Sequence, residues 1–193
     1  MSRKSKKHRA PSKKPPSFKE SCRAWYESKR PLLGFGLRFV AVMGVFYLLS
    51  LTPIYRQALA GAVLCYAQAA NAILEILGEK SVLDGATLRS EGEAIITVEP
   101  GCTGFDYSWF LMAAIAAFPA PILGKVLGII AGVAVILGLN VVRVTSLFWV
   151  GVHRPEHFAF VHEQLWAVVL NVATVCLMVA WIVWIKRRNE TPD

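Results

Sequence analysis

The chain has 193 residues, of which 55% are hydrophobic and 18% are charged. Soluble domains are typically about 45–50% apolar and about 25% charged, so this composition excludes a disordered chain and argues against a soluble nucleic-acid-binding protein. The formal net charge is +8, but residues 1–30 hold 11 of the 21 Lys and Arg and only 2 of the 13 Asp and Glu. The basic character therefore belongs to an N-terminal tail, and the rest of the chain is apolar and almost neutral.

Four apolar stretches follow the tail, and each is close to the length of about 20 residues that a helix needs to cross the hydrocarbon core. The central apolar block is divided in two because Pro119 and Pro121 interrupt helical hydrogen bonding. We therefore predict four membrane spans. They are residues 33–52, 107–124, 126–142 and 164–185.

Positive charge sets the expected orientation of these spans. The basic tail is expected to remain in the cytoplasm, since loops rich in Lys and Arg stay on that side. With four spans, Lys125 and the cluster Lys186–Arg188 return to the same side. We expect a multi-pass membrane protein with both termini in the cytoplasm.

Residues 56–78 test this count. Gln57, Gln68, Asn71 and Glu75 fall on one polar stripe at helical spacing, with apolar residues elsewhere. This pattern predicts an amphipathic helix at the outer face. The alternative is a fifth span, which would place the C-terminal cluster outside.

Residues 79–100 form the expected outer loop. Asp84-Gly85 is a turn signal, and the run 94–98 has β-type residues that could pair with Thr87–Arg89. The expected fold class is an all-α integral membrane bundle of about four transmembrane helices, with the amphipathic outer-face helix and a small periplasmic β-hairpin. The tail, residues 1–30, is expected to be disordered and to touch anionic membrane lipid, with no nucleic-acid partner.

Cys102 is the first residue that could carry chemistry. It lies in the sequence Glu99-Pro-Gly-Cys-Thr-Gly104, and we expect a helix to begin at about Thr103. A helix N-terminus stabilises an anion, which favours a reactive thiolate. The alternative is a small buried apolar residue, as most isolated cysteines are. The four cysteines contain no CxxC pair and indicate neither a disulfide framework nor a zinc site.

Asn140 and Arg143 are the second feature. They are three residues apart and so share one helix face, near the expected outer boundary of the membrane. An ionisable residue in a membrane helix is costly and points to function. The alternative is an arginine that extends to the lipid headgroups. Asp106, one turn after Cys102, could pair with Arg143 or interact with the helix dipole.

The third feature is the loop 153–163, which holds three histidines. Its spacing matches no known zinc pattern, so we expect neither a metal nor another cofactor. His162 differs from His153 and His157 because it stands where the last apolar helix begins, although His157 could take its place if that helix starts earlier. A thiol, a guanidinium and an imidazole from three spans at one depth suit nucleophilic catalysis by cysteine.

At these residues the sequence resembles the exosortase/archaeosortase family, and its small size resembles the exosortase H type. The resemblance rests on Glu99–Gly104, on Asn140-Val-Val-Arg143 and on Phe160-Val-His-Glu163. It covers about residues 33–188, within an expected membrane catalytic domain of residues 31–188. Residues 189–193 would be a cytoplasmic end.

The resemblance implies a membrane cysteine protease or transpeptidase. Its partners would be exported proteins with a C-terminal sorting tail, made of a recognition motif, a membrane helix and a basic cluster. Cys102 matches the nucleophile that forms an acyl-thioester, and Arg143 matches an arginine that acts as proton donor or thiolate partner. His162 matches the third member, a base or transition-state stabiliser, and Thr103 stands where many members have serine.

Two other functions remain open from the sequence. A non-enzymatic scaffold or assembly subunit of an envelope export pathway would need the helices but not Cys102. A small transporter would need Arg143 and Asn140 to line a polar path.

Overall fold

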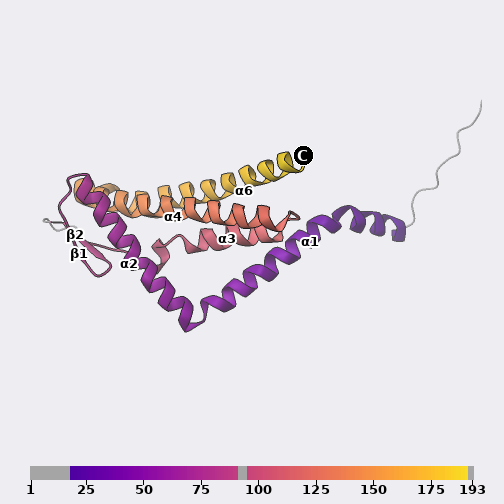
Figure 1. The fold of residues 1–193 in the computed structure, drawn as a ribbon, viewed down its shortest axis with the longest axis horizontal. Helices are drawn as coiled ribbons and strands as arrows, with labels where there is room; N and C mark the ends of the chain where they lie inside the picture. Colours follow the sequence, from indigo (N-terminus) through magenta and orange to yellow (C-terminus); the bar gives the residue numbers. More distant parts are fainter. Residues whose placement is uncertain (1–17, 91–94, 191–193) are drawn as a thin grey trace, which may run out of the picture. The chain divides into compact units, whose positions relative to one another are not determined.

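The structure is a computed structural model, and it describes residues 18–90 and 95–190. Contacts divide the chain into two units, residues 1–34 and residues 35–193. The elements in chain order are α1 (Phe18–Ser50), α2 (Pro53–Ile76), β1 (Ser81–Asp84), β2 (Thr87–Ser90), β3 (Ile95–Thr97), η1 (Pro100–Cys102), α3 (Phe105–Ala117), α4 (Ile122–His153), η2 (Pro155–His157), α5 (Phe158–Phe160), η3 (Val161–Leu165) and α6 (Trp166–Glu190) (Figure 1).

Four helices in the described part of the chain are long and apolar enough to cross a membrane. The all-α membrane bundle with four such helices and a small sheet is therefore confirmed. The four segments are Trp25–Ser50, Pro53–Ile76, Ile122–His153 and Pro155–Arg188.

The identity of one expected span differs. The stretch 107–124 yields only α3, which has 13 residues, because Phe118 leaves the helical conformation in front of Pro119. In its place α2, with 24 residues, has the length and composition of a span. The polar stripe on residues 56–78 is present, but Ala, Leu and Ile elsewhere on α2 keep it apolar enough to cross.

The boundary of the N-terminal tail also differs. Residues 18–30 were expected to be disordered, but α1 begins at Phe18 and continues through Pro31 to Ser50. Apart from Pro31, the sequence 18–34 holds many residues that helices accept, such as Glu20, Ala24 and Glu27. Residues 1–17 of the tail and residues 191–193 of the C-terminal end lie outside the described part.

The sheet has three antiparallel strands in the order β1-β2-β3. The predicted pairing of β2 with β3 is confirmed, with Thr87 opposite Thr97, and β1 is an additional strand on the other side of β2. Gly85 has a φ of +60°, which the tight turn between β1 and β2 requires and which glycine adopts without strain.

A buried cluster joins the sheet to the helices. Leu88 and Val98 of the sheet region pack with Leu74 of α2 and with Val144 and Phe148 of α4. A second cluster, between α3, α4 and α6, includes Leu111, Ile136 and Trp181. The sheet is thereby fixed near the C-terminal end of α4.

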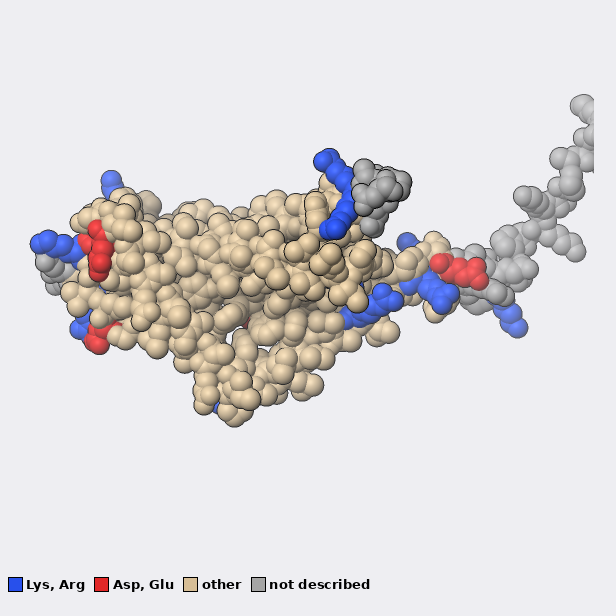
Figure 2. Space-filling model, viewed as in Figure 1, with Lys and Arg blue, Asp and Glu red and all other residues tan. Residues whose placement is uncertain are grey.

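Helices α4 and α6 lie side by side and run in opposite directions (Figure 1). Lys125 at the start of α4 and Lys186–Arg188 at the end of α6 therefore share the end of the bundle opposite the sheet. On the face drawn in Figure 2, the broad surface of the bundle between these ends is almost without charged side chains. Such an uncharged band matches the apolar interior of a bilayer.

Candidate functional site

Cys102 lies at the end of a single 3-10 turn rather than inside the first turn of a long helix. Helix α3 starts at Phe105, later than the expected Thr103, because Gly104 interrupts the helix with a φ of +69°. The turn is closed by Thr103, whose hydroxyl donates to the Pro100 carbonyl at 2.7 Å. The backbone N–H of Cys102 donates to the Glu99 carbonyl at 2.8 Å. These bonds hold the thiol-bearing residue in one backbone conformation.

Asn140 of α4 is hydrogen-bonded to this turn. Its side chain is fully buried, and its amide donates a hydrogen bond to the Cys102 carbonyl. A Cβ atom at position 104 would lie 3.3 Å from the Asn140 side chain, so glycine is needed there for space as well as for its φ angle. The Tyr66 hydroxyl faces Asn140 but falls outside hydrogen-bond geometry, so this hydroxyl and Asn140 Oδ1 are both buried without a partner.

The structure brings Cys102 and His162 together although 60 positions separate them. Cys102 Sγ lies 3.6 Å from His162 Nε2, within hydrogen-bond range for sulfur. The Phe158 ring stacks on the His162 ring, with 5.6 Å between the ring centroids. This stacking restricts the imidazole to an orientation that faces the thiol.

A local change in helix geometry positions His162. Residues Val161–Leu165 form a π-helical turn between α5 and α6, a feature that is frequent at functional sites. The turn is anchored by buried Trp166, whose indole N–H donates to the Ser146 hydroxyl of α4 at 3.0 Å. The π-helical turn thus changes the direction of the side chains relative to a regular α-helix at the point where the imidazole faces Cys102.

Cys102 and His162 open into one cavity of about 210 Å³, which we call the thiol cavity. One wall is the chain segment Ile95–Glu99, which includes the whole of β3. Val144 and Leu147 of α4 add an apolar part of the lining, and Phe158 and His162 complete it.

Arg143 faces a different cavity, of about 500 Å³, which we call the arginine cavity. Its side chain is only 8% exposed, and its Nε is buried without a hydrogen-bond partner. Within the described residues no ion pair closer than 4 Å joins Arg143 to Asp106, which is exposed on the first turn of α3. The lining includes Gly101, Asp106, Tyr107, Arg143, Asn171 and Thr174.

The two cavities share the Gly101-Cys102 segment in their linings, since Gly101 lines one and Cys102 lines the other. The predicted trio is therefore divided. The thiol and the imidazole are in contact, and the guanidinium lines the other cavity together with Gly101.

The other two histidines of the loop face elsewhere. His153 Nε2 pairs with Glu79 at 2.7 Å, and His157 Nδ1 lies 3.4 Å from Glu156. Neither lines the thiol cavity, so the structure favours His162 over His157 as the partner of Cys102.

Sequence reasoning missed several residues that shape the site. The spacing of Phe158 and His162, four positions apart, is a helical contact signal that could have identified the stacked pair. Tyr66 and Ser146 carry no comparable local signal, because both meet the site only through helix packing.

This arrangement can support acyl transfer. A thiol has a base within reach, and the backbone beside it is fixed by Asn140. A buried guanidinium with an unpartnered donor lies next to the same segment. These are the components of nucleophilic catalysis by cysteine: a nucleophile, a proton acceptor and a positive charge.

Comparison with known proteins identifies the family. The family described as transmembrane exosortase (Exosortase_EpsH) matches residues 30–181, which include Cys102, Asn140, Arg143 and His162. Comparisons with curated proteins and with solved structures gave no match. The matched residues include the sheet and the paired thiol and imidazole, and we conclude that this chain belongs to the transmembrane exosortase family.

Proposed function

We propose that this exosortase is a membrane cysteine protease and transpeptidase that cleaves the C-terminal sorting tails of exported proteins. The observation that carries the proposal is the 3.6 Å contact between Cys102 Sγ and His162 Nε2, two residues that line one cavity. A thiol beside a base is the minimum needed to form an acyl-thioester.

In the acylation step, His162 Nε2 accepts the thiol proton while Cys102 Sγ bonds to the carbonyl carbon of the scissile peptide. The carbonyl oxygen becomes an oxyanion. Its collapse breaks the carbon–nitrogen bond, and His162 returns the proton to the departing amine. The acyl part of the substrate remains on Cys102 as a thioester.

In the transfer step, an acceptor that is water, an amine or a lipid headgroup loses a proton to His162 and attacks the thioester carbon. The carbon–sulfur bond breaks, and Cys102 leaves as a thiolate that recovers the proton. The same residue thus acts as base and then as acid in each step.

Arg143 is proposed to stabilise negative charge on the thiolate or the oxyanion. The backbone N–H groups of Cys102 and Thr103 already donate within their own turn, which leaves them engaged. Arg143 retains an unpartnered donor next to that turn. Preorganised donors aimed at developing charge are among the strongest contributions to catalysis. Asn140 and Thr103 act as positioning residues, and Asp106 contributes to the charge around the arginine cavity.

The four apolar helices and the family indicate a multi-pass membrane protein. We propose that it lies in the bacterial inner membrane with both termini in the cytoplasm. This orientation requires that α2, although long and apolar enough to cross, lies at the outer face, and that α3 with the residues up to Lys125 carries the chain across. The sheet end, which is opposite the basic end of α6, would then face the periplasm. A substrate whose basic tail stays in the cytoplasm would present its recognition motif at that face.

The test is a comparison of C-termini of membrane and exported proteins in cells that carry the native chain or Cys102→Ala. The expected result is a set of proteins that lose a hydrophobic C-terminal helix only with the native chain. Mass spectrometry of C-terminal peptides identifies them, and a gel shift follows one of them over time.

Cys176→Ala is the matched control, because Cys176 is an exposed cysteine of α6 away from the thiol cavity. It should process the substrate as the native chain does. Processing by Cys102→Ala at the native rate would refute the cysteine mechanism. A scaffold function would be indicated if export failed only in variants that disturb helix packing.

A further inference from the structure

We propose that the outer edge of β3 is the docking strand for the substrate, and that the recognition segment of the sorting tail binds there as a fourth strand of the sheet. The inference rests on the proposed function, since it assigns how the peptide reaches Cys102. It specifies main-chain pairing, which the catalytic residues alone do not imply.

The register of the sheet shows which groups β3 offers. Val98 N–H donates to the Ala86 carbonyl at 2.9 Å, so the main-chain groups of Val98 and of Ile96 point toward β2. Main-chain groups in an antiparallel strand alternate in direction, so those of Ile95 and Thr97 point away from β2. Within the described residues they have no backbone partner. Two outward donor–acceptor sets therefore stand about 7 Å apart, at the spacing of an extended peptide.

The two edges of the sheet differ in what lies next to them. Strand β1 contacts α2, and the Ser81 hydroxyl donates to Asn71 of that helix at 2.8 Å. Strand β3 borders the thiol cavity instead, and its Ile95 side chain is 60% exposed. An uncovered apolar edge is a ready template for pairing with another chain.

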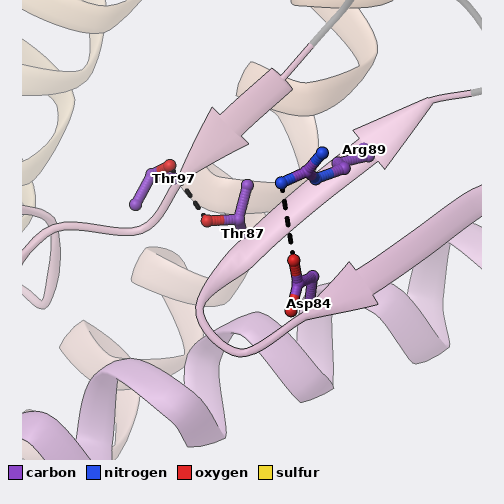
Figure 3. A network of polar contacts seen from close by, with 4 residues as sticks. All are labelled: Asp84, Thr87, Arg89 and Thr97. Atoms are coloured by element: carbon purple, nitrogen blue, oxygen red, sulfur yellow. Dashed lines mark hydrogen bonds and ion pairs between the residues drawn. The ribbon is translucent and has the colours of Figure 1, made fainter.

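Side-chain contacts join the strands of the sheet, and one of them, between Thr87 and Thr97, involves β3. The hydroxyls of Thr87 and Thr97 lie 3.1 Å apart, and Arg89 pairs with Asp84 at 3.4 Å, so each neighbouring pair of strands has a cross-strand contact (Figure 3). From the opposite face, Ile96 packs against the buried cluster of α2 and α4. The docking edge is thus preorganised before a peptide binds.

The cavity specifies the occupant. Its lining combines Ile95–Thr97 of β3 with Cys102, Phe158 and His162. An extended peptide that pairs with Ile95 and Thr97 fills this channel, and its backbone passes the thiol. Main-chain pairing supplies affinity, and the apolar lining formed by Val144 and Leu147 binds a side chain of the recognition motif.

Hydrogen exchange tests the pairing directly. The probe is a tail-bearing protein identified by its uncleaved C-terminus in Cys102→Ala cells, purified in complex with that variant in detergent. The amides of Ile95 and Thr97 should exchange rapidly in the free variant and at least tenfold more slowly in the complex. The amides of Ile96 and Val98 are bonded to β2 in both states and should change little. Unchanged exchange at Ile95 and Thr97 in a stable complex would overturn the proposal.

Proline substitutions test the same point in the active enzyme. Thr97→Pro removes an outward N–H and keeps every bond of β3 to β2, and it should slow processing by about tenfold. Ile95→Pro places proline at the first residue of the strand, a position where sheets tolerate it. This variant replaces Thr97→Pro in the test if Thr97→Pro fails to fold.

Ser81→Pro is the matched control on the other edge. Ser81 is also the first residue of an edge strand, and the same alternation places its N–H on the outer side. It should process at the native rate. If all three proline variants processed at equal rates and Cys102→Ala abolished processing, strand addition would be overturned and the proposed function would stand. If Cys102→Ala processed normally, the proposed function would fail first.

Discussion

The two cavities beside Gly101-Cys102 differ in content, and the difference separates two tasks. The thiol cavity holds the Cys102 thiol and the His162 imidazole in direct contact, and β3 contributes to its lining. The arginine cavity is larger and holds a buried guanidinium whose Nε has no partner. In the proposed mechanism, proton transfer takes place in the thiol cavity, and the arginine cavity supplies the positive charge.

The largest expected effect comes from His162, the proposed general base in the thiol cavity. His162→Ala should lower the processing rate by about 10²- to 10⁴-fold, the usual contribution of a general base, without loss of the folded bundle. The measurement is the rate of tail loss by gel shift, with thermal unfolding as a check of folding. His157→Ala is the matched control and should stay within about twofold. Equal losses in the two variants would break the assignment of His162.

The next effect concerns the arginine cavity. Arg143→Met should slow processing by about 10²- to 10³-fold, as loss of a charge-stabilising donor does. The thermal midpoint should stay level or rise, because a buried cation without a close anionic partner is removed. A strong fall in the thermal midpoint would instead assign Arg143 a structural role.

A smaller effect is expected from the segment between the cavities. Gly104→Ala should destabilise the protein by about 1–2 kcal/mol. The left-handed conformation is unfavourable for alanine, and the added Cβ atom contacts the Asn140 side chain. Thermal unfolding in detergent measures the change. Gly138→Ala is the matched control, since a Cβ atom there has no neighbour within 4 Å and alanine favours the helix. A neutral Gly104→Ala would show that the Cys102 turn tolerates rearrangement.

The smallest effect is predicted for Asp106. Asp106→Asn should change stability by less than about 0.5 kcal/mol and processing by less than about twofold, because the residue is exposed and makes no close ion pair with Arg143. The same gel-shift and unfolding measurements apply. A loss comparable to that of Arg143→Met would mean that the two side chains act as a pair.

Local pattern predicted the elements of the bundle more reliably than their extent. Apolar runs and turn signals placed the last two long helices and the β2–β3 pairing, because these depend on composition and spacing within short windows. They misjudged α3, which ends before Pro119, and the tail, where α1 begins at Phe18. Strand β1 was missed because Ser81–Asp84 is too short and too polar to stand out without its partner.

The sequence by itself determined that this chain is an apolar membrane bundle and, through three short motifs, which residues could carry its chemistry. Only the tertiary structure decided which of those residues meet. The pairing of Cys102 with His162 depends on how the π-helical turn rotates the start of α6 against η1. The packing of α4 directs the Asn140 amide to the Cys102 carbonyl, and it directs Arg143, about one turn further on, to the arginine cavity. Contacts between residues distant in sequence depend on the packing of whole helices, which no local pattern encodes.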